Sequence, residues 1–579
     1  MAGSRDVQEA SFRHHVVTEQ QSEMEEGNGG DQVIREVVSI PQTPRGGGTP
    51  SGTRSPYHSN QMSNAHSHAI TPTGTRPPSG LASPSMSRSP LLKTPKTPRT
   101  PRTPKTPRTP WTPSLSPIGA PMKRVLVNMK TYLEDVGHLT KLNPQDAWLP
   151  ITESRNGNAY YSAFHNLNAG IGFQALVLPV SFTVLGWTWG IISLVVAYIW
   201  QLYTLWLLVR LHESVPGKRY NRYGELAKAA FGEKLGGWLS TFPILYLSGG
   251  TAMGLIIVAG GSLKLFFQIV CGPTCESNPL SSVEWYLVFT CLAVVVSQLP
   301  NLNSIAWFSL IGAATSVTYC TMIWVLSVSQ PRPPNVSYDP VRAKSDVASA
   351  FTILNALGAI TFAFRGHNLA LEIQATMPSS LKHPAHVPMW RGAKVAYTLI
   401  AFCLFPIAIG GYWAYGNLIP QGGILNALYG FHNQDISRGL LGLTFLLVVI
   451  NCLTSFPIYA MPIFDDFEAS YIGWANKPCP LWVRSGFRMV FTFMGFFFGV
   501  AFPFLNSLAG LLGGITLTVT FAYPCLMWIM IKKPEKYSSS WYLNWGLGIF
   551  GVILSIAFSI GGVWSIVDSG LKLHFFKPS

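Results

Sequence analysis

The stretch 351–378, FTILNALGAITFAFRGHNLALEIQATMP, places residues able to bind or exchange protons inside an apolar run long enough to span a bilayer. They are Phe364, Arg365, Gly366, His367, Asn368 and Glu372. At membrane depth such polar groups cost several kcal/mol unless they face a protein interior or a water-filled cavity. Gly366 favours a break in the helix, and a break frees backbone N–H and C=O groups to bind a ligand. The stretch therefore predicts a substrate site in a membrane transporter.

A second apolar run, 159–182, also carries glycines and polar residues at its middle. The candidate site residues there are Asn168, Gly170, Gly172, Phe173 and Gln174. Interrupted segments in corresponding positions of two halves of a chain point to a transporter binding site.

Two side chains of the first stretch are candidates for proton coupling. Glu372 is one, because burial favours the neutral form of a carboxyl group. His367 is the other, because imidazole titrates near neutrality. A structural hydrogen bond is the competing role for His367, and a place near the inner mouth is the competing reading of Glu372. Asp465 and Asp466, at the inner end of the eighth apolar run, are expected to be solvated.

Composition places these stretches in a membrane protein. The chain has 579 residues, is 48% hydrophobic and only 12% charged, whereas soluble domains carry roughly twice that charge. From about Ala159 to Gly570 the apolar residues form eleven segments, so we expect an all-α membrane domain over 158–579 in contact with the lipid bilayer. The segments centre near 159–182, 186–209, 238–270, 283–299, 303–329, 347–376, 392–415, 439–464, 483–503, 506–531 and 543–568.

The first 120 residues form a different part of the chain. They are rich in Ser, Thr, Pro and Gly and cannot bury a core, so they predict a disordered basic tail. The repeat KTPKTPRTPRTPKTPRTP offers a proline-directed kinase six threonines, namely Thr94, Thr97, Thr100, Thr103, Thr106 and Thr109. The repeat is either a solvated tail or a segment attracted to anionic lipid until it is phosphorylated. Segment 121–157 is predicted to be cytoplasmic and to precede the membrane.

Orientation follows from the basic residues of the loops. With the N-terminus in the cytoplasm, the inner loops hold most of the Lys and Arg residues, as the positive-inside rule requires. An odd number of spans then places the C-terminus outside. No apolar N-terminal leader is evident.

Asn335, in the sequon Asn-Val-Ser, falls in an outer loop and is a candidate for N-glycosylation. Cys271 and Cys275 fall in another outer loop, where a disulfide and free thiols are both open.

Several other functions lack their sequence signatures. The chain has no nucleophile elbow, phosphate-binding loop or zinc-protease motif, so no enzyme, cofactor or metal site is predicted. The net charge of +15 comes from the tail and the inner loops, and it therefore does not predict a nucleic-acid partner.

Nine short stretches, in order, form a specific pattern. They include ESVPGKR at 213–219, FGEKLG at 231–236, LPNLNS at 299–304, GHN at 366–368, PMWRG at 388–392, IYAMP at 458–462 and KPEKYS at 533–538. From about Ala147 to Lys572 the chain resembles the plant lysine/histidine transporter-like carriers of the amino acid/auxin permease family.

The resemblance implies a LeuT-like fold of two inverted five-helix repeats plus one helix. It also implies proton-coupled amino-acid uptake at the plasma membrane, with a site between the first, third, sixth and eighth spans. Asn451 and Ser455, on the eighth span, are then candidate lining residues. Family members usually have a Gly-small-Gly break in the first span, and here the matching residues are Gly172, Phe173 and Gln174. The bulk of Phe173 and Gln174, together with Arg365, keeps a non-transporting amino-acid sensor as the alternative.

Arg365 is a second departure, since this position is usually small or apolar in the family. Its permanent charge has three possible roles: a counter-ion for Glu372, a ligand for a substrate carboxylate, or a replacement for the ion of a sodium-coupled relative. If it faces the substrate, it favours neutral or acidic amino acids and disfavours lysine and arginine.

Overall fold

The structure is a computed structural model, and it describes residues 148–153, 155–272, 280–302, 304–380, 382–502 and 505–568. The predicted tail with its six threonines, most of segment 121–157, Cys275 and the C-terminal residues lie outside these ranges. The predicted domain boundaries therefore remain predictions.

Within the described residues all regular structure is helical, apart from one isolated bridge between Val215 and Lys218. The helices are α3 (Ala159–Gly170), α4 (Phe173–Leu211), α5 (Tyr223–Phe231), α6 (Glu233–Cys271), α7 (Ser282–Ser297), α8 (Ala306–Ser329), α9 (Asp346–Phe362), α10 (His367–Ala375), α11 (His386–Tyr415), η3 (Gly416–Leu418), α12 (Ile424–His432), α13 (Arg438–Ala475), α14 (Leu481–Ala501), α15 (Leu505–Leu517), η4 (Thr518–Ala522), α16 (Tyr523–Lys532) and α17 (Ser539–Asp568).

Eight helical stretches in this part of the chain are long and apolar enough to cross a membrane. They are Phe173–Leu211, Glu233–Cys271, Ala306–Ser329, Asp346–Ala375, His386–Leu418, Arg438–Ala475, Ser507–Lys532 and Ser539–Asp568. Helix α7 is apolar but shorter, with 16 residues. The fold class is therefore all-helical and membrane-embedded, and the finer count of eleven spans is taken up below as a proposal.

Local sequence sets where these helices begin and bend. The Asn158 side chain caps α3 by accepting from the backbone N–H groups of Tyr160 and Tyr161, at 2.9 and 3.1 Å. Ser345 caps α9 by accepting from the backbone of Ala348. Helix α4 turns back at Gly186, whose φ of 68° is easily reached only without a Cβ atom. Two of the predicted segments, 159–182 and 186–209, therefore meet inside α4.

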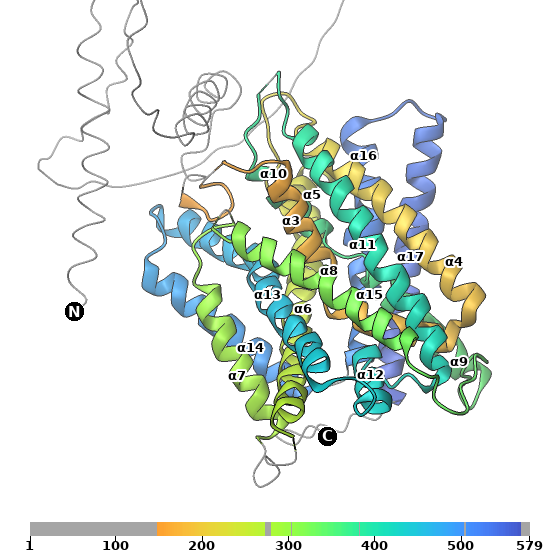
Figure 1. Cartoon of the computed structure of the whole chain (residues 1–579). Helices are drawn as coiled ribbons and strands as arrows, with labels where there is room; N and C mark the ends of the chain where they lie inside the picture. The colour runs from red at the N-terminus through yellow and green to blue at the C-terminus, as the bar shows by residue number, and fades with distance from the viewer. Residues whose placement is uncertain are drawn as a thin grey trace, which may run out of the picture. The chain divides into compact units, whose positions relative to one another are not determined.

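The interrupted helices lie inside the bundle. Helix α3 packs against α8, α11 and α13, and α10 packs against α3, α4, α5 and α13. Helix α15 packs between α9 and α17. Figure 1 shows α5 and α10 toward one end of the bundle and α12 toward the other. These are called the α5 end and the α12 end below.

Segments predicted on the same side of the membrane meet at the same end. At the α5 end, the backbone N–H of Gly157 donates to the carbonyl of Thr376 at 2.8 Å. At the other end, the N–H of Val341 donates to the carbonyl of Thr183 at 2.8 Å, and the N–H of Asn417 donates to Ser337 at 2.9 Å. Which end faces the cytoplasm remains a prediction from the basic residues.

Candidate functional site

Two helix breaks form the frame of the site. The first consists of Ile171 and Gly172, both extended, between α3 and α4. The second lies between Phe362, the last residue of α9, and His367, the first of α10. Gly366 has a φ of 122° there, a conformation that L side chains rarely adopt. The break expected around Gly366 is therefore present.

The first break begins at Ile171, one residue earlier than the sequence match placed it, and it ends at Gly172. Phe173 and Gln174 are the first residues of α4 and not part of the extended segment. The residues that flank and form the break are Gly170, Ile171 and Gly172. The bulk of Phe173 and Gln174 therefore does not occupy the extended backbone, which removes one of the two observations behind the sensor alternative and leaves Arg365 as the other.

Arg365 brings the two breaks together. It is 1% exposed, and a Cβ atom placed on Gly172 would lie 3.3 Å from its Nη2. Three aromatic rings surround its guanidinium carbon: Phe362 at 4.5 Å, Tyr459 at 4.8 Å and Phe173 at 5.1 Å from the ring centroids. Aromatic faces attract a cation, and more strongly when it is desolvated.

No carboxylate accompanies this cation. Among the described residues, Arg365 forms no ion pair, and its three nitrogen atoms have no hydrogen-bond partner. Glu372, the counter-ion proposed from the sequence, is not within ion-pair distance of it. The charged groups near Glu372 are instead Asp465, Asp466, Arg222 and Glu225.

The polar residues of the first break are held by α13. Asn451 donates to the side-chain oxygen of Asn168 at 3.2 Å, and Ser455 donates to the same oxygen at 2.8 Å. Ser455 also reaches the carbonyl of Asn168 at 3.2 Å, and Tyr459 donates to the carbonyl of Ala169. Three sequence candidates, Asn168, Asn451 and Ser455, therefore form one buried cluster, and Tyr459 extends it toward Arg365.

His367 makes a structural contact with α4. Its Nε2 lies 3.0 Å from the carbonyl of Gln201 and 3.1 Å from the hydroxyl of Thr204. A carbonyl oxygen only accepts, so Nε2 carries the hydrogen in this arrangement. Asn368, the next residue, is fully buried, and both of its side-chain polar atoms have no partner. Buried polar atoms of this kind are available to a bound ligand.

Glu372 belongs to a second group of charges, at the α5 end. It is 5% exposed, and Asp465 is 1% exposed. Asp465 accepts from the side chain of Arg222 and, at 3.2 Å, from the backbone N–H of Ile151. The expectation that Asp465 is solvated is therefore wrong. Its position at the end of an apolar run could not reveal that the α4–α5 loop folds over it.

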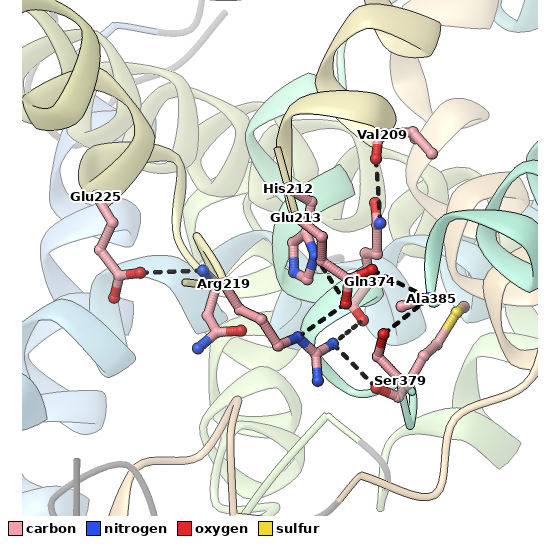
Figure 2. A network of polar contacts seen from close by, with 10 residues as sticks. Val209, His212, Glu213, Arg219, Glu225, Gln374, Ser379 and Ala385 are labelled. Atoms are coloured by element: carbon pink, nitrogen blue, oxygen red, sulfur yellow. Dashed lines mark hydrogen bonds and ion pairs between the residues drawn. The ribbon is translucent and has the colours of Figure 1, made fainter. Parts of the chain in front are cut away.

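Figure 2 shows how that loop is joined to α10 and α11. The Nε atom of Arg219 lies 3.1 Å from a carboxylate oxygen of Glu213, and its Nη2 atom donates to the carbonyl of Met377 at 3.1 Å. Glu213 accepts from the backbone N–H of Ala385 at 3.2 Å. Burial, with the positive charges of Arg219 and Arg155, holds the pKa of His212 well below its usual range. We call Glu213, Arg219, Met377 and Ala385 the loop clasp.

Sequence reasoning missed several members of the site. Phe362 and Tyr459 ring the guanidinium, Tyr319 donates to the carbonyl of Gly172 at 3.3 Å, and Gln201 and Thr204 hold His367. A tyrosine inside an apolar run is a weak signal by itself. The IYAMP stretch did contain Tyr459, but only as a family motif and not as a site residue.

Two predicted modifications fall at the α12 end. Cys271 is disulfide-bonded, while its predicted partner Cys275 lies outside the described residues. Asn335 is exposed in a turn, with a φ of 66°. Its glycosylation remains a prediction.

Known proteins resemble this chain over most of its length. Lysine histidine transporter-like 8 of Arabidopsis thaliana is 69% identical over 547 residues, covering 94% of this chain and 98% of that protein. Lysine histidine transporter-like 7 of the same plant is 45% identical, covering 75% and 90%. Among solved structures, a nucleobase-cation-symport-1 family transporter is 12% identical, with a TM-score of 0.49, over 76% of this chain and 97% of that one.

The sequence model described as "Transmembrane amino acid transporter protein" matches residues 155–567. These relatives are transporters and not enzymes, and both helix breaks lie inside the matched range. The lysine/histidine transporter-like resemblance is thereby confirmed, and the chain belongs to the transmembrane amino acid transporter protein family.

Proposed function

We propose that the protein is a proton-coupled symporter that carries neutral or acidic amino acids across the plasma membrane. Eleven spans, arranged as two inverted five-helix repeats plus one, are part of the proposal. Eight apolar stretches, the turn inside α4, and α7 and α14 supply enough helices for this arrangement. The two helix breaks would then occupy corresponding places in the two repeats.

The observation that carries the proposal is the buried, unpaired charge of Arg365 between the breaks. Desolvating a cation costs several kcal/mol unless an anion or hydrogen-bond acceptors compensate it. The three rings offset part of this cost, and a substrate carboxylate would offset more. An arginine fork matches a carboxylate in two-point geometry, so an amino acid is a chemically suitable ligand.

The same charge selects among amino acids. A second carboxylate on the substrate adds attraction, whereas a side-chain ammonium or guanidinium adds repulsion in a medium that screens poorly. We therefore propose neutral and acidic substrates. The relatives' names mention lysine and histidine, and Arg365 argues against lysine as a substrate of this chain.

Proton coupling is assigned to the group around Glu372. Glu372, Asp465, Asp466 and Glu225 lie near one another with Arg222 as the cation among them. Glu372 and Asp465 are the buried carboxylates of this group, whereas Asp466 is exposed, and carboxylates at membrane depth often serve as proton relays. His367 is proposed as a positioning residue, because its Nε2 hydrogen is engaged by α4.

Uptake into proteoliposomes made with the full chain tests this function. With an inward proton gradient, we expect alanine and glutamate to accumulate, lysine to accumulate weakly, and a protonophore to abolish accumulation. Binding without accumulation would instead identify a sensor. Strong lysine uptake would end the electrostatic argument, and accumulation that persists with the protonophore would end the proton argument.

A further inference from the structure

Gln174, in the first turn of α4, has a side-chain amide of which only the nitrogen is engaged. Its Nε2 donates to the carbonyl of Gly170 at 2.9 Å. A carbonyl oxygen only accepts, so this bond decides which end of the amide is the nitrogen. The Oε1 atom has no hydrogen-bond partner among the described residues, although Gln174 is only 1% exposed. A buried oxygen of this kind is an acceptor that a bound ligand can use.

This Oε1 atom lies near the guanidinium of Arg365. A Cβ atom placed on Gly172 would lie 2.9 Å from Oε1 of Gln174 and 3.3 Å from Nη2 of Arg365. The two atoms are therefore at most 6.2 Å apart, the sum of these distances. One is a neutral acceptor and the other a cationic donor, so together they suit a ligand that carries a positively charged donor close to an anionic acceptor.

Gly172 provides the room between these two atoms. Its φ of −163° is extended backbone, which residues with a side chain also adopt. The glycine is therefore not required for the backbone conformation. A Cβ atom at this position would crowd Oε1 of Gln174, so the missing side chain leaves space where a ligand can approach the break closely.

Other acceptors at the first break are already in use. Four backbone carbonyls there accept hydrogen bonds from side chains, and an ammonium group would have to compete with those donors. The carbonyls are those of Asn168, Ala169, Gly170 and Gly172, and the donors are, in the same order, Ser455, Tyr459, Gln174 and Tyr319. The Oε1 atom of Gln174 is an acceptor at the same break without such a bond.

We propose that Gln174 is a specificity-determining residue, whose Oε1 atom accepts a hydrogen bond from the α-amino group of the substrate while Arg365 binds the adjacent carboxylate. The inference rests on the proposed carboxylate site at Arg365 and narrows its substrates to amino acids with the amino group on the carbon next to the carboxylate.

The spacing of the two protein atoms carries this narrower class. In an α-amino acid three bonds separate the nitrogen from the carboxylate oxygens, a distance of about 3 Å with the bond lengths of a peptide unit. Such a ligand can contact Gln174 and Arg365 at once. In a γ-amino acid five bonds separate the same atoms, so the extended molecule is too long, and folding it back costs conformational entropy.

Binding of three small ligands to the purified full chain in detergent tests this role. The ligands are L-glutamate, glutarate, which is glutamate without its amino group, and γ-aminobutyrate, and isothermal titration calorimetry measures their dissociation constants. In wild type we expect glutarate and γ-aminobutyrate to bind about tenfold more weakly than glutamate, because each loses a hydrogen bond that involves a charged group. In Gln174→Met, glutamate should lose about tenfold in affinity, which corresponds to ~1.4 kcal/mol, and glutarate should bind as it does to wild type.

Gln298→Met is the matched control. The Gln298 side chain also donates to a carbonyl four residues earlier, that of Val294 at 3.0 Å, but it is exposed at the end of α7. This variant should bind all three ligands like wild type. If Gln174→Met does not yield monodisperse protein, Gln174→Leu takes its place with the same expected result.

The proposal is overturned if glutarate binds to wild type as tightly as glutamate does. It is also overturned if the Gln174 variant loses glutamate and glutarate equally, because Gln174 would then only support Arg365. Arg365→Ala distinguishes these outcomes from a failure of the proposed function, since it should weaken glutamate and glutarate alike. If neither affinity changes in Arg365→Ala, the carboxylate site itself is wrong and the role of Gln174 falls with it.

Discussion

Arg365 is the residue whose replacement says most about the substrate. In Arg365→Ala we expect transport of glutamate to fall far more than transport of alanine, because losing one partner of a desolvated charge pair costs ~2–5 kcal/mol. Arg365→Lys keeps the charge but not the two-point geometry and should fall between wild type and Arg365→Ala. Uptake of alanine and glutamate by the three proteins, normalised to surface amount, measures this.

The competing structural role predicts a different pattern. If Arg365 served only as a partner of Glu372, Arg365→Ala would damage all substrates equally, and adding Glu372→Gln would restore part of the activity. The structure places the two side chains beyond ion-pair distance, so we expect no recovery in the double variant.

Glu372 carries a separate prediction. Glu372→Gln removes a titratable group while keeping size and hydrogen bonding, so we expect proton-driven accumulation to be lost. Exchange of labelled for unlabelled substrate, which needs no net proton movement, should persist. Counterflow and gradient-driven uptake in the same proteoliposomes separate the two steps. Equal loss of both would assign Glu372 a structural role instead.

At the scale of helices and loops, the loop clasp can be tested by amide hydrogen exchange. Arg219→Ala removes a charge-assisted hydrogen bond to the end of α10, and such bonds contribute ~1.5–3 kcal/mol. We expect amide hydrogen exchange in 374–385 to rise on the order of tenfold.

Lys218→Ala is the matched control for the loop clasp. Lys218 is exposed, it carries the same charge next to Arg219, and its ammonium lies over the Tyr220 ring at 5.1 Å instead of reaching α10. Its removal should leave exchange in 374–385 unchanged. An equal rise in both variants would show that loop charge, and not the contact with α10, holds this end together.

The sequence predicts a structural feature well when the feature depends on neighbouring residues in the chain. Gly366 within an apolar run identified the second break correctly, because a positive φ and the missing Cβ atom are properties of one residue. The first break was predicted to begin at Gly172 instead of Ile171 and to run on into α4, since Gly170 and Gly172 both qualify locally. The burial of Asp465 and the rings around Arg365 depend on contacts between helices far apart in the sequence, which hydrophobic periodicity does not encode.

For the whole molecule, the membrane domain should transport without the tail. The family match begins at residue 155, and residues 1–115 have no apolar pattern that could pack against it. Deleting them should leave the KM for substrate within about twofold, as expected of remote surface changes. Uptake per molecule at the cell surface is the measurement, with surface biotinylation as the control for trafficking. A larger change in KM would show that the tail contacts the site.

The hydroxyl groups of Ser455 and Tyr459 have a consequence for the energy source of the carrier. Ser455 already donates to the side-chain oxygen of Asn168 at 2.8 Å, and Tyr459 donates to the carbonyl of Ala169 at the first break. Both are the kind of hard oxygen ligand that an alkali-metal ion prefers. A sodium ion entering there would have to displace two hydrogen bonds, each contributing ~1 kcal/mol net, beside the fixed charge of Arg365. We therefore expect that a sodium gradient does not drive transport by this protein.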